Sequence, residues 1–202
     1  MKRIFNKAYW LWRFVRRLEP IRFLWHVGFI SVLACYKASV SAQIFLVTML
    51  FLALILTFFE LHAKRKVSLF KKLLREKEIA SRTAAVDFVI GCIATCILAP
   101  HFVVPILLAT AWCDPCARVF GKYMHGKKIP GIDKSYWGAF ACFVVALTVL
   151  VLFFSWKVAL FLAVIAMFAE ACDPRNLTKR WWWLQDNGRI QVALAISLLV
   201  VG

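Results

Sequence analysis

Long apolar stretches alternate with short basic ones along this chain. Long uninterrupted apolar runs predict helices surrounded by apolar groups, whereas the strands of a β-barrel alternate apolar and polar residues over short segments. The pattern therefore predicts an all-α protein, a polytopic transmembrane bundle of about seven spans. The expected spans are 22–36, 43–61, 84–99, 102–113, 137–154, 158–172 and 189–202.

The positive charge is confined to four segments between these spans. The 202 residues are 63% hydrophobic and carry 26 Lys and Arg against 10 Asp and Glu. All but two of the 26 basic residues lie in 1–22, 62–83, 114–136 and 173–189. Basic loops stay on the cytoplasmic side of a membrane. The net charge of +16 is thus explained by membrane topology, and no nucleic-acid partner is expected.

The remaining gaps carry little charge and are expected on the opposite side. They lie near Lys37, Pro100 and Lys157. Residues 84–113 can alternatively form one helix kinked at Pro100, which would reverse everything that follows, but the charge pattern favours two spans. Several spans hold only about 12–16 residues, fewer than the roughly 20 of a full crossing, so they would tilt little, thin the bilayer or be partly re-entrant.

The N-terminal segment, residues 1–21, mixes Trp and Phe with Arg and predicts a basic amphipathic helix at the membrane interface. A cleaved signal peptide is the alternative, but the basic region is too long for one. Residues 22–202 are expected to form a single transmembrane domain. No organellar signal is evident, which favours a bacterial inner membrane, with a site facing the cytoplasm.

Ionisable residues in or beside the spans gather at the predicted cytoplasmic ends. Such residues are costly in a membrane and are functional candidates by default, although a helix-end carboxylate can also be simply solvated. That they share one membrane face predicts a single site. The candidates are His26, Glu60, Asp87, Asp114, Glu170, Asp173 and Asp186.

The segment from Asp114 to Gly138 carries the clearest chemistry. Asp114 is expected to end the fourth span and to bind Mg²⁺. A loop with glycines and lysines follows, suited to phosphate, and Lys134-Ser135 precede a helix whose start attracts anions. For a single lysine the alternative is a topology signal. The expected phosphate-binding residues are Gly121, Lys122, Lys128, Lys134, Ser135 and Asn187.

Three further positions complete the predicted site. Glu170 in the sixth span could ligate metal or act as general base, or make an interhelical hydrogen bond. Asp186-Asn187 open the last span, where a helix N-cap is the alternative. His26 could contact phosphate or transfer a proton, or form a polar contact between helices. Cys113-x-x-Cys116 has metal-like spacing, but no second pair matches it.

In this order the pieces resemble the CTP-dependent polyprenol kinase family, which includes dolichol kinase, phytol kinase and a CTP-dependent diacylglycerol kinase and is distantly related to phosphatidate cytidylyltransferases. Its opening element is matched by Glu19 to Gly28, and its Gly-Asp-x-x-Ala-x-x-x-Gly-(Lys/Arg) core by Cys113 to Lys122. The Lys-Ser/Thr-x-Glu-Gly element is matched by Lys134 to Gly138, followed by Glu170 and Asp186-Asn187. The resemblance covers roughly residues 19–200.

The chain departs from the family pattern at three positions. Cys113 replaces a Gly, Trp137 a Glu and Phe23 a Lys. If that Glu binds metal in the relatives, this chain lacks one ligand, for which Asp133 could substitute. A diverged, non-catalytic member is therefore an alternative.

The resemblance implies a Mg²⁺-dependent membrane enzyme that transfers the γ-phosphoryl of CTP to an isoprenoid alcohol or to diacylglycerol. Asp114 and Glu170 would hold the metal, and Asp186 and His26 would join them as catalytic residues. The alternatives are a phosphatidate cytidylyltransferase and a non-catalytic membrane protein or transporter. CTP rather than ATP rests on the resemblance alone. The oligomeric state is open, with a homodimer as one option.

Overall fold

The protein is all-helical in the computed structural model, which describes residues 20–66, 84–124, 127–130, 134–172 and 186–201. This confirms the predicted α class, and each predicted apolar stretch coincides with one helix. The helices are α2 (Pro20–Ser39), α3 (Ala42–Lys66), α6 (Ala84–Leu98), α7 (Val103–Tyr123), α8 (Tyr136–Leu150), α9 (Trp156–Ala171) and α10 (Asp186–Val201), with a 3₁₀ turn at Pro100–Phe102. The expected interfacial segment 1–21 lies almost wholly outside the described residues.

The prediction for the fourth helix is wrong at its C-terminal end. The sequence predicted an end at residue 113, before Pro115, but α7 continues to Tyr123. A proline inside a helix removes one backbone hydrogen bond. Here Asp114 and Arg118, one turn apart, form an ion pair across it, and α7 contacts α8 both before the proline, at Cys113, and after it, at Ala117. Gly121 and Lys122 consequently lie in the last helical turns and not in a loop.

One helical stretch in the described part of the chain, Pro100–Lys122, is long and apolar enough to cross a membrane. Within its most apolar window 61% of the residues are buried inside the protein, and a core helix of a soluble protein can have the same length and composition. The apolar portions of the other helices are shorter. They are Val27–Ser39, Ala42–Phe58, Ala85–Leu98, Tyr136–Leu150 and Gly188–Val200.

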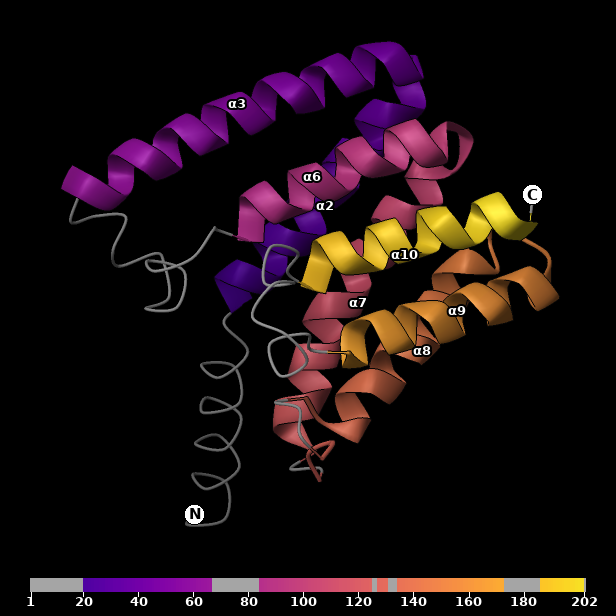
Figure 1. The fold of residues 1–202 in the computed structure, drawn as a ribbon. Helices are drawn as coiled ribbons and strands as arrows, with labels where there is room; N and C mark the ends of the chain where they lie inside the picture. Colours follow the sequence, from indigo (N-terminus) through magenta and orange to yellow (C-terminus); the bar gives the residue numbers. More distant parts are fainter. Residues whose placement is uncertain (1–19, 67–83, 125–126, 131–133, 173–185, 202) are drawn as a thin grey trace, which may run out of the picture.

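Successive helices run in opposite directions, so that the start of one helix lies near the end of another (Figure 1). Lys134, just before α8, contacts Glu170 at the end of α9. Arg189 in the first turn of α10 donates to the carbonyl of Cys172, just after α9. We call this region, where the starts of α6, α8 and α10 meet the ends of α7 and α9, the polar end. At the opposite end the Phe102 and Phe154 rings lie 5.4 Å apart.

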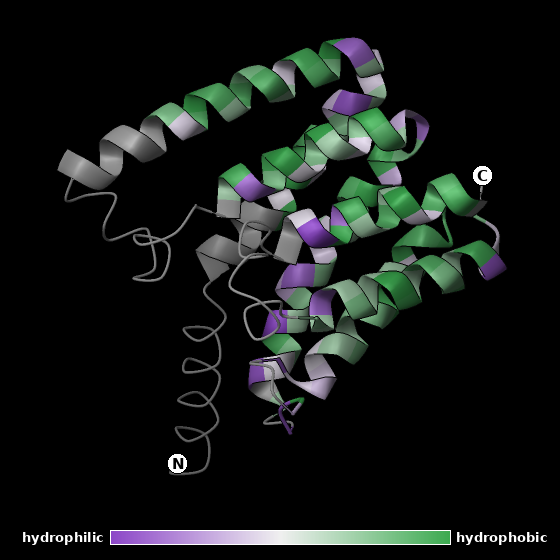
Figure 2. Ribbon diagram, in the orientation of Figure 1, coloured by the Kyte–Doolittle hydropathy of each residue, from purple (hydrophilic) through white to green (hydrophobic). Residues whose placement is uncertain are grey.

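Two buried clusters hold the helices together. The first, which we call the small-residue core, joins α7, α8, α9 and α10, and half of its sixteen buried members are alanines. The second, the large-residue core, joins α2, α3, α6 and α7, and only two of its twelve buried members are alanines. Figure 2 shows apolar residues over most of the helices, with hydrophilic residues toward the helix ends.

Glycine brings α7 and α8 into close contact. A Cβ added to Gly138 would lie 2.8 Å from the backbone oxygen of Ala117, and one on Gly121 would lie 2.8 Å from the Ser135 hydroxyl. Small residues let helix backbones approach in this way. The polar residues before α8 are thereby held against the last turns of α7.

Candidate functional site

Asp114 lies within α7 and is buried. Its side chain is 3% exposed, and the Arg118 guanidinium donates to both carboxylate oxygens over 3.1 Å. The four-residue spacing puts the two side chains on one helix face. The sequence selected Asp114 but assigned no role to Arg118, although this spacing was visible in it.

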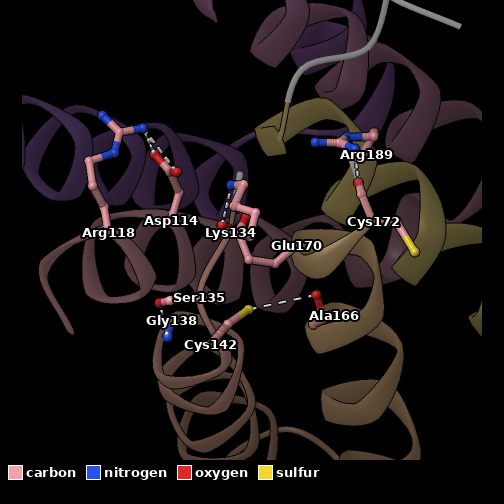
Figure 3. Close-up of polar contacts among 10 residues, drawn as sticks. All are labelled: Asp114, Arg118, Lys134, Ser135, Gly138, Cys142, Ala166, Glu170, Cys172 and Arg189. Carbon is pink, nitrogen blue, oxygen red and sulfur yellow. Dashed lines mark hydrogen bonds and ion pairs between the residues drawn. The ribbon is translucent and has the colours of Figure 1, made fainter. Parts of the chain in front are cut away.

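Lys134 and Glu170 are brought together by the fold (Figure 3). The Lys134 ammonium lies 2.5 Å from one carboxylate oxygen of Glu170, whose side chain is 4% exposed. The residues are 36 positions apart and approach from the start of α8 and the end of α9. The sequence had selected one for phosphate and the other for metal, without predicting that they touch.

Weak sulfur hydrogen bonds link α7, α8 and α9. The Cys113 thiol donates to the carbonyl of Cys142 over 3.5 Å, and the Cys142 thiol donates to the carbonyl of Ala166 over 3.6 Å. Asp114 follows the first of these residues directly, and Glu170 lies one turn after the last. The two ion pairs are thus attached to a single packed three-helix unit, as the sticks in Figure 3 illustrate.

The segment before α8 folds back on itself. Residues Lys128 and Ser135 form an antiparallel bridge, in which Ile129 donates to the Lys134 carbonyl over 2.8 Å and Tyr136 donates to the Lys127 carbonyl over 3.3 Å. Lys128, which the sequence selected for phosphate, is therefore held beside Lys134 and Ser135. The Lys128 side chain is exposed.

The start of α8 is less open to an anion than the sequence suggested. Ser135 is the N-cap residue, and its hydroxyl accepts the Gly138 N–H over 3.0 Å. The Tyr136 N–H is taken by the bridge. Two of the first-turn donors that the prediction offered to phosphate thus have partners within the protein. Lys134 and Lys128 remain as the charged groups that could attract an anion there.

Two residues that the sequence reasoning missed support the polar end. The Arg189 side chain donates to the backbone carbonyl of Cys172 and so places a positive charge at the C-terminal end of α9, where it is favourable. Gln191 is fully buried, and its amide fills the space beside Gly91 on α6. Gln191 is the one polar side chain between Arg189 and Ser197, and a single polar residue in an apolar stretch could have marked it as a candidate in the sequence.

For the other predicted site residues, the structure describes the backbone alone, the burial alone or nothing. His26 lies on α2, Glu60 on α3 and Asp186 with Asn187 in the first turn of α10, but only their backbone positions are described. Asp87 lies in the first turn of α6 and is buried. Asp133 and Asp173 lie outside the described residues.

The two departures from the family pattern in this region have different surroundings. Cys113 is fully buried, and its side chain fills the interface between α7 and α8. Trp137 is 44% exposed, with its ring edge-on to Phe140, which is also exposed. Residue 137 therefore lies on the outer face of α8, whereas Gly138 beside it faces α7.

Asp114 and Glu170 could both contribute to a Mg²⁺ site. In the part of the chain that the structure describes, no three His, Cys, Asp or Glu side chains converge as a self-sufficient metal site. Mg²⁺ commonly binds through one or two carboxylates together with substrate phosphates. Two buried carboxylates, Asp114 beside Arg118 and Glu170 beside Lys134, fit a metal that arrives with a phosphate ligand.

Comparison of the chain with protein-family models, curated proteins and solved structures found no match. The resemblance drawn from the motifs therefore stays an expectation, and the chemistry of the polar end has to be argued from the residues themselves.

Proposed function

We propose that this protein is a membrane-embedded lipid kinase that transfers the γ-phosphoryl of CTP, with Mg²⁺, to an isoprenoid alcohol or diacylglycerol. The observation that carries the proposal is the contact between Lys134 and Glu170. Two motif residues selected separately, one for phosphate and one for metal, meet at the end of the bundle that also holds Asp114. CTP as donor rests on the motif resemblance.

Exposed apolar side chains support the membrane placement. Soluble monomers rarely expose contiguous apolar patches beyond a few hundred Å², yet α3 alone exposes a row of large apolar side chains along its length. These are Ile44, Val47, Leu50, Phe51, Leu54 and Phe58. Lipid is the solvent that accepts such a surface, and the other helices would cross the bilayer beside Pro100–Lys122 in a bundle of about seven spans.

The polar end fits the cytoplasmic headgroup layer. Exposed Tyr136, Trp137 and Phe140 lie next to exposed Lys127 and Lys128. Aromatic and basic side chains gather where a membrane meets water. A lipid alcohol moving within the bilayer would therefore present its hydroxyl at the depth of the two ion pairs, and a bacterial inner membrane with this end in the cytoplasm would supply nucleotide.

The chain's own residues would act mainly by positioning and charge. Asp114 and Glu170 would hold the metal, which when bound neutralises charge on the transferring phosphoryl group. Lys122, Lys128 and Lys134 would bind the phosphate oxygens, and the close packing of Gly121 on Ser135 would hold the segment before α8 against α7. A carboxylate, Glu170 or Asp186, would orient the acceptor hydroxyl or take its proton. Such positioning supplies most of the rate enhancement in phosphoryl transfer.

Labelled nucleotide tests this proposal. Purified protein in lipid nanodiscs is given Mg²⁺, a mixed extract of lipid alcohols and phosphatidate, and CTP labelled at either the α or the γ phosphorus. We expect label in lipid only from the γ position, and loss of labelling in Asp114→Ala. Lipid label only from the α position would make the protein a cytidylyltransferase. Folded protein that gives no lipid label at all would be a non-catalytic member.

A further inference from the structure

Asp114 and Glu170, the two site carboxylates whose side chains the structure describes, are each paired with a cation from the same chain. Arg118 contacts both oxygens of Asp114 at 3.1 Å, and Lys134 contacts Glu170 at 2.5 Å. The carboxylates are the deeper partners, with side chains 3% and 4% exposed. The Arg118 and Lys134 side chains are 26% and 19% exposed. A ligand arriving from outside would therefore meet the cations before the carboxylates.

These pairs cannot simply open. A buried carboxylate that loses its cation is left as an uncompensated charge in a poorly polarisable interior, which is strongly unfavourable. The Lys134–Glu170 pair also joins the start of α8 to the end of α9, two helices that the Cys142 thiol contacts as well. The exchange of one cation for another avoids the exposed charge, whereas the loss of a cation does not.

This arrangement has a consequence for the order of binding. A divalent cation alone must displace the Lys134 ammonium from Glu170 and would then lie beside it, so like charges would repel. A polyphosphate alone would approach ammonium and guanidinium groups that are already paired with carboxylates. The negative charge of those carboxylates would repel it. When both ligands bind, the carboxylates pair with the metal and the two basic side chains pair with phosphate. No charge is then left without a partner.

We propose that Lys134 and Arg118 change partners, from carboxylate to phosphate, when a divalent cation and a polyphosphate bind together. The two ligands then bind with positive cooperativity, and each alone competes with an internal ion pair. The inference concerns the site of the proposed function and rests on that function for the identity of the natural anion. It makes Arg118 a further phosphate-binding residue.

The first test measures anion binding. Labelled inorganic tripolyphosphate is bound to the full chain in nanodiscs of uncharged lipid, with Mg²⁺ or with a chelator. We expect Mg²⁺ to tighten binding by at least about tenfold, within the usual range of coupling between sites. In Glu170→Gln the ammonium of Lys134 is released from its carboxylate, so binding without metal should tighten several-fold and the effect of Mg²⁺ should shrink. If Glu170 were only a metal ligand, its loss would leave binding without metal unchanged.

The second test measures metal binding without an anion. Lys134→Gln removes the internal cation, so Mn²⁺ added without any anion should bind several-fold more tightly, as measured from the paramagnetic resonance of free Mn²⁺. Tripolyphosphate binding should fall in the same variant. Lys157→Gln is the matched control, because Lys157 lies at the other end of α9 and contacts the Trp156 ring; it should change neither affinity.

The outcomes separate this inference from the proposed function. The inference is overturned if Mg²⁺ leaves tripolyphosphate binding unchanged, or if Lys134→Gln gains no affinity for Mn²⁺ and folded Glu170→Gln gains none for metal-free anion. If Glu170→Gln fails to fold, the Mn²⁺ measurement on Lys134→Gln decides. Cooperative binding without any transfer of γ label from CTP to lipid would uphold the inference and reject the kinase. Transfer without these gains would do the reverse.

Discussion

The two cores of this protein are built in opposite ways. The small-residue core joins α7 to α10 through eight alanines and two cysteines together with six Ile and Leu, and a Cβ added to Gly138 of α8 would lie only 2.8 Å from a backbone oxygen of α7. The large-residue core joins α2, α3 and α6 to α7 through side chains such as Phe45 and Met49. Both described ion pairs are attached to the small-residue core.

The difference explains where the candidate site lies. Close backbone packing fixes helix positions with little slack, so short polar contacts such as that of Lys134 with Glu170 can be held between helices. In the large-residue core, buried side chains such as Phe45 and Met49 fill the space between the helices. Substitutions should therefore distinguish the two cores. The large-residue core should be sensitive to truncation of its side chains, and the close contact of α7 with α8 should be sensitive to their enlargement.

The largest effect on stability is expected in the large-residue core. Phe45 is fully buried, with its ring 6.0 Å from Tyr36. Phe45→Ala should lower the free energy of unfolding by about 3–5 kcal/mol, the range for truncation of a buried aromatic side chain. Phe51→Ala, at a 64% exposed position on the same helix, should cost far less. Unfolding in mixed micelles measures both, and equal losses would contradict the comparison.

Under the proposed function, charge removal at the small-residue core should strongly reduce activity in protein that still folds. Glu170→Gln is expected to reduce transfer of γ label from CTP to lipid by about 100-fold, the scale found when one preorganised charged or polar contact is lost. The control is Lys157→Gln at the opposite end of α9, which should retain full transfer. Wild-type rates in folded Glu170→Gln would remove Glu170 from the site.

Enlarging a side chain where α7 meets α8 should lower stability, just as truncating one lowers it in the large-residue core. Gly138→Ala places a methyl group 2.8 Å from the Ala117 backbone oxygen, and such overpacking costs about 1–3 kcal/mol. Gly28→Ala is the matched change, since a Cβ there has nothing within 4 Å and alanine favours helix. We expect thermal unfolding to shift down for the first variant only. A downward shift of the same size for Gly28→Ala would show that close packing is not the cause.

The smallest effect is expected at the helix start. Ser135 caps α8 through its hydroxyl, whereas Ser155 occupies the same position of α9 without a side-chain cap bond. Ser135→Ala should destabilise by about 1 kcal/mol, and Ser155→Ala by much less. Chemical denaturation of the two variants in parallel makes the comparison, and a larger loss at Ser155 would argue against the cap.

The sequence predicted the helices well because helix formation depends on neighbouring residues, whereas the roles of the site residues stay predictions. The apolar runs gave the helices, and the motif residues Asp114, Lys134 and Glu170 all lie at the polar end. The end of α7 was misjudged because Pro115 reads locally as a stop, whereas the helix continues packed against α8 on both sides of the proline. Arg118 was passed over although its spacing from Asp114 was readable.

Composition and periodicity determined the helical class and the approximate bounds of the helices, because both arise from local preference and the burial of apolar runs. Only the tertiary structure decided that Lys134 touches Glu170, that Gly138 meets the backbone of α7, and that Ser135 uses its own hydroxyl as a cap. These contacts depend on the register between packed helices. That register is set by side-chain shape across an interface, which no single segment of the chain contains.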